Sequence, residues 1–345
     1  MRVAAIVVAW NSVDDLPDCL AALAAQDHDD LEVVVVDNAS TDDTAELLRA
    51  WWAGAPRPAR VVTNPTNRGF AGGVNDGLAV LGADVEAVLL VNPDARAAPD
   101  LVRRCVEVLR TRPEVGSVQP RLVRPAAGDT PGVLDTTGHV FTTARLWRNR
   151  GEGEPDDGRH RDSGEVFGAS GALVLHRRAM LDEVAWWHPD GSREVLTEDL
   201  FAFFDDVELD WRAQLFGWSC VYEPTATGIH ERGGAGPRRT TRVEALNYAN
   251  RLLVVATCDD AGALLRAAPL VVVTTLLKTL ELAVTEPRAL PTAIGRLMRS
   301  LPAARHRRRQ LRARARHPFA MVPARWAEPF RWRPWVTTWW RRVRA

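Results

Sequence analysis

Two stretches decide the fold: VAAIVVAWNS at residues 3–12 and LEVVVVDNASTD at residues 31–42. Each is an apolar run, rich in β-branched residues, that stops at a polar cluster. The runs do not alternate between apolar and polar side chains, so both faces of each strand are expected to be buried. Amphipathic segments lie between the runs. This order predicts an α/β fold, with a mostly parallel sheet covered by helices on both faces.

The same pattern continues along the chain. Further strands are expected at 60–63, 87–91, 115–122, 172–176 and 219–223, and helices at 14–25, 42–52, 73–81, 99–110 and 204–216. The carboxyl ends of parallel strands meet at one edge of a sheet, so the polar residues that follow the strands are candidates for a ligand site. No G-x-G-x-x-G follows the first strand and no Walker sequence occurs, so dinucleotide and P-loop sites lose their main support.

The charge is distributed unevenly along the chain. Basic and acidic residues balance at 44 each, yet residues 301–345 contain thirteen arginines and a single acid, Glu328. A basic segment on an acidic body indicates contact with an anionic surface. Five tryptophans interleave with these arginines, which suits a lipid headgroup region. A nucleic-acid arm is the alternative for such a segment, but the acidic remainder and the lack of a recognisable nucleic-acid fold argue against it.

Residues 243–257 and 264–284 carry long apolar faces. Arg266, Lys278 and Glu281 keep the second segment below the roughly 20 apolar residues of a spanning helix. We therefore expect two amphipathic helices that lie in a membrane interface. A helical pair packed on the preceding domain is the alternative, and the pattern alone does not decide between them.

A series of motifs carries a family resemblance: VVAWNS, VVDNASTD, NRGFAGGVNDG, LLVNPDA, GASGALVLHRR, FFDDVELDWR and a later histidine. In order and spacing this series resembles the family-2 glycosyltransferases with the GT-A fold, and most closely their bacterial rhamnosyltransferase-like branch. The resemblance covers about residues 3–232 and extends weakly to NYANRLL at 247–253. It implies a catalytic domain at 1–232, with a nucleotide-binding half (1–114) and an acceptor and metal half (115–232). A membrane-associated helical region (233–300), opening on a linker (233–239), and a basic tail (301–345) would follow.

The resemblance also implies an activity. A sugar would move, with inversion, from a nucleotide diphosphate donor to a hydroxyl of a cell-envelope or lipid-linked glycan. dTDP-rhamnose is the favoured donor, and UDP-galactofuranose or another UDP-sugar is the alternative. A non-catalytic sugar-nucleotide binder or membrane scaffold is the alternative from another class, favoured only by Asn92, which stands where many relatives have an acid.

The expected cofactor is Mg²⁺ or Mn²⁺. The expected location is cytoplasmic, on the inner face of the cell membrane. The scattered cysteines fit a reducing compartment, and the first apolar run is too short for a signal peptide. An anionic membrane surface is an expected partner and nucleic acid is not; a homo-oligomer is left open.

The donor site is expected at the strand ends. Asp37 has the acceptor geometry to bind the imide N–H of uracil or thymine, and the resemblance gives it that role; Ser40 and Asp42 are then left to cap the next helix. A glycine-rich turn after Asn67 lets the backbone approach a ligand, and Arg68 could pair with phosphate. The full expected set is Ala9, Asn11, Asp37, Asn38, Asn67, Arg68, Gly69, Asn75, Asn92 and Asp94.

Metal binding and catalysis are expected to involve acids from distant parts of the chain. The resemblance makes Asp94 and His230 the metal ligands, and one carboxylate plus a diphosphate suffices for such hard cations. It makes Asp206 the catalytic base and Asp205 the residue that positions the acceptor, with Asp199 in reserve. Adjacent carboxylates repel, which raises the pKa of one of them. The acceptor or sugar is expected to contact Ser170, Gly171, Trp211 and Arg212.

Overall fold

The computed structural model describes residues 1–125, 132–188, 190–232 and 240–344, so the expected linker at 233–239 lies outside the described residues. Within these ranges, the strands of the main sheet are β1 Val3–Ala9, β2 Leu31–Asp37, β3 Ala59–Thr63, β4 Ala87–Val91, β5 Ala95–Ala97, β6 Val115–Arg124, β7 Val133–Thr136, β10 Gly164–Val166, β11 Leu173–Arg177 and β14 Ser219–His230. Their order is β10-β14-β6-β11-β4-β1-β2-β3, with β5 beside β14 and β7 beside β6.

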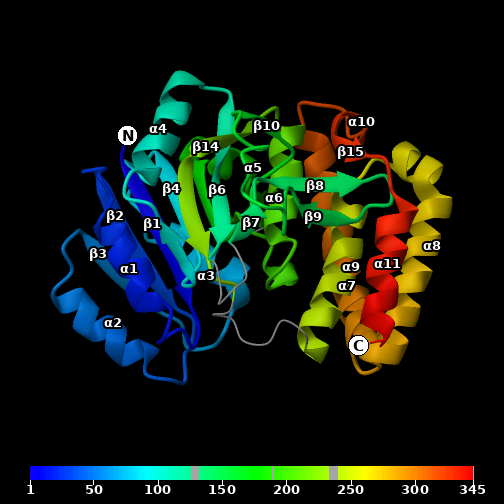
Figure 1. Cartoon of the computed structure of the whole chain (residues 1–345), viewed down its shortest axis with the longest axis horizontal. Coiled ribbons are helices and arrows are strands. Elements are labelled where there is room, and N and C mark those ends of the chain that lie inside the picture. Colours follow the sequence, from blue (N-terminus) through cyan, green and yellow to red (C-terminus); the bar gives the residue numbers. More distant parts are fainter. Residues whose placement is uncertain (126–131, 189, 233–239, 345) are drawn as a thin grey trace.

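The directions of the strands decide which strand ends lie at the same edge of the sheet. The strands β3, β2, β1 and β4 are parallel, whereas β11 runs antiparallel to both β4 and β6. Because β14 is parallel to β6, the carboxyl ends of β1 to β4 and of β14 lie at the same edge of the sheet as the start of β11 (Figure 1). We call this edge the site edge.

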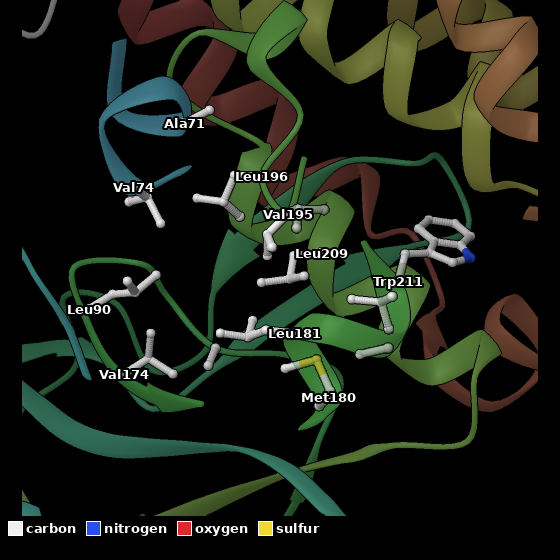
Figure 2. Packing of buried hydrophobic residues seen from close by; sticks show 14 of the residues in the cluster. Ala71, Val74, Leu90, Val174, Met180, Leu181, Val195, Leu196, Leu209 and Trp211 are labelled. Carbon is white, nitrogen blue, oxygen red and sulfur yellow. The ribbon is translucent and has the colours of Figure 1, made fainter. Parts of the chain in front are cut away.

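Both faces of the sheet are buried, as the unbroken apolar runs predict. Alternate residues of β1 point to opposite cores, with Ile6 and Val8 in one and Ala5 and Val7 in the other. The first core is covered by α3 Gly69–Ala79, α5 Arg178–Val184 and α6 Asp205–Leu215, and Figure 2 shows part of it. The second core is covered by α1 Leu16–Ala24, α2 Thr44–Ala53 and α4 Leu101–Thr111.

The carboxyl-terminal segment is part of the fold, which corrects the expected tail at 301–345. Its elements are α9 Ala289–Arg314, α10 Met321–Trp326, β15 Ala327–Glu328 and α11 Trp332–Arg344. β15 pairs with β8 His139–Thr142, which also pairs with β9 Trp147–Asn149. The expected boundary between residues 300 and 301 lies inside α9. The remaining short elements are β12 Trp186–Trp187, β13 Arg193–Glu194 and η1 Glu198–Leu200.

The two segments expected in a membrane interface behave differently. α7 Thr241–Cys258 packs against α6 and α9, and Ala249, Leu253 and Val254 are buried. For this helix the interface prediction is wrong and the packing alternative is right. α8 Ala261–Thr285 lies at the outer edge of the molecule (Figure 1), and much of its apolar surface is exposed. Within the described ranges, it is the one helix long and apolar enough to cross a membrane, by length and composition.

Candidate functional site

The loops that follow β1 and β2 are tied together at the site edge. The Asn11 side-chain oxygen accepts the N–H of Thr41 at 2.7 Å, and the Ser40 hydroxyl accepts the N–H of Asn11 at 3.0 Å. Asn11 takes a left-handed backbone conformation (φ 50°) to make this turn. The Ala9 carbonyl accepts the N–H of Asn38 at 2.8 Å. The first two polar clusters found in the sequence therefore form one rigid rim.

Asp37 and Asp42 each accept a backbone N–H in the loop between β2 and α2. Asp37, the last residue of β2, is buried and accepts the N–H of Ser40 at 3.0 Å. Asp42 accepts the N–H of Thr44, the first residue of α2. Asp37 also lines a hollow of about 210 Å³ between α2 and β3, smaller than the roughly 300 Å³ at which ligand pockets usually begin.

Asn38 organises the glycine-rich turn. Its side chain accepts the N–H of Arg68 and donates to the Gly69 carbonyl at 2.8 Å, and it bonds to the Asn67 side chain at 3.2 Å. Gly69 has a positive φ of 74°, and a Cβ here would lie 2.2 Å from the Phe201 carbonyl oxygen. The close approach that the glycine permits is therefore to Phe201 rather than to a ligand.

Arg68 and Asn75 brace α3 against the segment that precedes α6. The Arg68 guanidinium pairs with Asp76 and, at 2.7 Å, with Glu198. The Asn75 side chain donates to the Leu196 carbonyl at 2.8 Å. The partners of Arg68 are thus two carboxylates, and the contacts of Asn75 are with protein backbone and with Glu198. Both side chains therefore hold α3 against the segment before α6, and their contacts with the nucleotide stay a prediction.

Asp94 and His230 meet at the site edge, as the resemblance implies. His230 Nε2 lies 3.3 Å from Asp94 Oδ1, and its Nδ1 lies 2.8 Å from Asp135 Oδ2. Asp135, on β7, is 1% exposed and also pairs with Arg124 and Arg232. Sequence reasoning missed Asp135, because no motif indicates that both β7 and β14 pair with β6. The carboxylate fixes the ring so that Nε2 faces Asp94.

The charges around His230 fit a cation site. Burial would lower the pKa of His230, but the hydrogen bonds and charges of Asp135 and Asp94 outweigh it and raise that pKa to about 8. Two carboxylates thus attract a positive charge to this point. Within the part of the chain that the structure describes, no three His, Cys, Asp or Glu side chains are arranged to hold a metal ion. A cation held by Asp94 and His230 would need further oxygen ligands, such as water and phosphate.

The start of α6 brings the acid pair to the same edge. Asp206 Oδ2 accepts the N–H of Gly171 at 3.1 Å, and its side chain is 26% exposed. The next residue along, Ala172, accepts the N–H of Asn92 at 2.8 Å, two residues before Asp94. Asp206 and Asp94 are therefore joined through one short segment at the start of β11. Asp37 ends β2, which is separated from β4 only by β1, and two strand spacings amount to about 10 Å.

Asp205 differs from its neighbour. It is buried, and its Oδ2 has no hydrogen-bond partner among the described residues. Burial first, and then the charge of Asp206, raise the pKa of Asp205 well above its ordinary value. The repulsion predicted from the sequence therefore raises the pKa of Asp205. Asp199, the reserve candidate, pairs with Arg307 of α9 at 2.8 Å.

Asn250 of α7 holds the loop that delivers this acid pair. Phe201, Phe203 and Phe204 all have positive φ values, between 63° and 67°. The buried Asn250 side chain contacts the carbonyl oxygens of Leu200, Ala202 and Phe203 at 2.8 to 2.9 Å. These bonds fix a backbone that non-glycine residues rarely adopt. The faint NYANRLL similarity was the only signal for this residue.

The expected acceptor residues divide into two pairs. Ser170 and Gly171 lie at the site edge, where the Ser170 N–H bonds to Gln119 at 2.8 Å. Trp211 and Arg212 are fully buried. Figure 2 shows Trp211 within the buried cluster, and Arg212 pairs with Glu208 at 2.8 Å. Acceptor contact by Trp211 and Arg212 is therefore a prediction that the structure contradicts, because helical periodicity carries both side chains into the core.

Comparisons with known proteins identify a family and relatives of this chain. The model of the family described as glycosyl transferase family 2 matches residues 4–184. The chain is 22% identical over 223 residues to poly-beta-1,6-N-acetyl-D-glucosamine synthase of Staphylococcus epidermidis, covering 64% of this chain and 48% of that protein. The chain thus spans about half the length of that relative.

Two further likenesses bear on branch and fold. The chain is 25% identical over 248 residues to N-acetylglucosaminyl-diphospho-decaprenol L-rhamnosyltransferase of Mycobacterium tuberculosis, covering 66% of this chain and 75% of that protein. A crystal structure of GalNAc-T7 with UDP, GalNAc and Mn²⁺ superposes with a TM-score of 0.63 at 11% identity, covering 94% of this chain and 56% of that one. The structural likeness shows the fold alone, and it confirms the predicted GT-A architecture.

Proposed function

The chain belongs to glycosyl transferase family 2, and from that membership we propose that it transfers a sugar, with inversion, from a nucleotide diphosphate donor to a glycan hydroxyl. The observation that supports this most directly is the meeting of Asp94, His230 and Asp206 at the site edge. Asp94 and His230 lie 3.3 Å apart, and the Gly171 segment joins them to Asp206. Asp37 contributes the base-reading carboxylate of the same rim.

We assign the chemistry to Asp206. Its carboxylate takes the proton from the acceptor hydroxyl, and that oxygen attacks the anomeric carbon as the bond to the nucleoside diphosphate breaks. One displacement inverts the anomeric configuration, and a product that retained the donor's configuration would contradict the scheme. The N–H groups of Gly171 and Val207 hold the two oxygens of Asp206 in place. A bound Mg²⁺ or Mn²⁺, held by Asp94 and His230, would stabilise the charge on the departing diphosphate.

The donor we favour is dTDP-rhamnose, since the mycobacterial relative is by its name a rhamnosyltransferase. That name also describes a lipid-diphosphate-linked acceptor, which supports a lipid-linked or cell-envelope glycan here. A UDP-sugar is the second candidate, and UDP in the GalNAc-T7 structure favours it. The enzyme would work at the cytoplasmic face of the cell membrane, with residues 1–232 as the catalytic unit.

The donor can be identified from ligand-dependent thermal stability. We expect the true donor's nucleotide to raise Tm in the presence of Mn²⁺, and the rise to grow with ligand concentration; at 100 times Kd the stabilisation is about 2.7 kcal/mol. The panel is dTDP, UDP and GDP, then the sugars of the base that binds. Asp37→Asn is the matched variant, and it should abolish the preference for uracil or thymine. A panel in which no nucleotide shifts Tm, with or without Mn²⁺, would contradict the proposed function.

A further inference from the structure

The polarity of α8 is the reverse of that of an ordinary surface helix. Its polar side chains face the protein: Lys278 pairs with Glu244 at 3.2 Å and with buried Glu281 at 2.8 Å, and Thr279 bonds to Tyr248 at 2.7 Å. Its outward side chains are apolar and between 42% and 76% exposed: Leu265, Val272, Val273, Leu276, Leu280 and Val284. A helix in water turns its apolar stripe inward.

The outward residues of α8 form a stripe. Val272, Leu276, Leu280 and Val284 follow one another at four-residue spacing, so they lie along a single side of the helix. We call the outward apolar residues of α8 together the α8 face. Ile294 and Met298 of α9 are exposed as well. Among the exposed residues of α8, the only charged one is Arg266. An apolar patch of this extent marks a binding surface.

The exposed charged residues nearest the two ends of α8 are arginines. Arg266 lies near the start of α8 and Arg288 just beyond its end, and both are exposed. Further exposed arginines continue along α9: Arg299, Arg305, Arg309 and Arg312. An apolar stripe bordered by cations matches the apolar boundary and anionic headgroups of a lipid bilayer. We propose that the α8 face docks on an anionic bilayer.

The helix would lie along the membrane rather than cross it. Its 25 residues are long enough to span. Crossing, however, would detach Lys278 and Glu281 from Glu244 and expose these charges to lipid, which is strongly unfavourable. With the inner side held by α7, only the outer side can enter the interface. This inference rests on the proposed function insofar as a lipid-linked acceptor gives the docking a purpose.

Co-sedimentation with vesicles tests the proposal independently of catalysis. We expect the whole protein to bind phosphatidylcholine vesicles that contain phosphatidylglycerol more tightly than vesicles without it. Val272→Glu/Leu276→Glu should lower the bound fraction about tenfold or more, because buried carboxylates are costly in lipid. The matched control is Ala50→Glu/Ala53→Glu, which adds the same charge to exposed positions of α2, at the opposite side of the molecule (Figure 1).

Two results would overturn the docking proposal. One is equal vesicle binding by the α8 variant and the α2 variant. The other is a dimer in light scattering that the α8 variant converts to monomer while lipid binding is absent, since the face would then belong to a second copy. Thermal shift with the donor nucleotide reports the catalytic domain separately, so a failed donor site and a failed lipid surface give different results.

An independent observation concerns His139, which links two acids of α6. Its ring is buried, with Nδ1 at 2.9 Å from Asp210 Oδ2 and Nε2 at 3.6 Å from Asp206 Oδ2. Asp210 is fixed by the N–H of Ala169 at 3.0 Å. Gly168 leaves the room for it, because a Cβ there would lie 1.8 Å from the Asp210 carboxylate. The GASG motif thus holds Asp210, and Asp210 orients His139 toward Asp206.

The charged side chains that act on His139 are all acids. Burial would lower the pKa of His139, but the charges of Asp206, Asp210 and Asp205 and the hydrogen bond to Asp210 outweigh it, and the pKa is raised. Burial raises the pKa of Asp210 to about 6 against the opposing effect of His139. The ring thus lies between the carboxylates of Asp206 and Asp210.

We infer that His139 is a positioning residue that keeps Asp206 oriented as the base. This rests on the proposed role of Asp206. His139 Nε2 faces Asp206 Oδ2 at 3.6 Å, and the Gly171 N–H bonds to the same oxygen at 3.1 Å. Without the ring, the carboxylate would lose a contact that holds this oxygen in place.

His139→Gln tests this through its separate effects on kcat and on the KM of the donor. We expect kcat to fall by roughly ten- to a hundredfold, as misplacement of a catalytic group does, with the KM of the donor and Tm close to the wild-type values. His176→Gln is the matched control, because His176 is also buried but pairs with the Ser117 hydroxyl. A merely structural role would lower Tm and weaken donor binding together with kcat, which would overturn the inference. An Asp206→Asn enzyme with full activity would instead refute the base itself.

Discussion

Asp206→Asn is expected to lower kcat by roughly 10² to 10⁴-fold, the usual contribution of a positioned general base. Asparagine keeps the size of the side chain and an oxygen that accepts the Gly171 N–H, a bond of 3.1 Å in the native chain. The loss should therefore fall on kcat, with little change in donor affinity or Tm. Turnover of the donor identified by thermal shift, with mass spectrometry of the product, measures it.

Asp199→Asn is the control for this prediction. Asp199 precedes the same loop, but its carboxylate pairs with Arg307 at 2.8 Å and faces α9. Its replacement should reduce stability slightly and leave kcat within a few-fold of the native value. If Asp206→Asn retained full turnover, the acid at the start of α6 would not be the base. If the native protein bound the donor but turned none of it over, the non-catalytic alternative that Asn92 raised would be favoured.

The second large effect is expected at the proposed metal site. His230→Ala removes one of the two protein ligands, and we expect kcat/KM to fall by roughly 10²-fold or more, because a Lewis acid on the leaving group contributes several kcal/mol. Mn²⁺ binding in the presence of the nucleoside diphosphate, followed by electron paramagnetic resonance or calorimetry, should weaken in parallel. Activity of the native enzyme that survived complete chelation of divalent cations would contradict the assignment.

Asp135→Asn separates orientation from ligation at this site. Asparagine can still accept a hydrogen bond from His230 Nδ1, which lies 2.8 Å away in the native chain, but it lacks the charge. Changes to such supporting groups usually weaken metal affinity by about 10 to 100-fold. We therefore expect a higher Mn²⁺ requirement with kcat restored at saturating metal, whereas His230→Ala should not be restored. Equal behaviour of the two variants would mean that Asp135 does more than orient the ring.

The sequence predicted most reliably those features that depend on a single strand, namely its burial and the polar residues at its end. The apolar run in β1 predicts a strand buried on both faces, and alternate residues do enter two cores. Asp37 and His230 are the last residues of β2 and β14, and Asp94 follows the end of β4. These strand ends share one edge of the sheet, so the order of the motifs predicted that the three residues lie at that edge. Asp206 was placed by its motif. Trp211, on the same helix, was expected to contact the acceptor but is buried, because the motif does not indicate which side of α6 faces the core.

Residues that act through long-range contacts escaped prediction. Asp135, His139 and Asn250 each make their decisive contact with a residue at least 47 positions away. No local pattern marks them, since an acid in a short strand or an asparagine in a helix has many ordinary uses. The same limit explains α7 and α8. Both carry apolar faces, but one packs on α6 and the other faces outward, and only the tertiary arrangement distinguishes them.

The grip of Asn250 on the loop before α6 has a mechanical consequence. The loop that presents Asp206 is shaped by α7, and α7 in turn carries α8 through the Lys278–Glu244 pair. The loop that presents the proposed catalytic acids and the outward-facing helix are thus linked through α7. A protein that ended at residue 232 would keep every proposed catalytic acid. It would lose α7, whose Asn250 fixes the conformation of the loop before these acids. If α8 binds to lipid, docking of that helix and the position of Asp205 and Asp206 are coupled through α7.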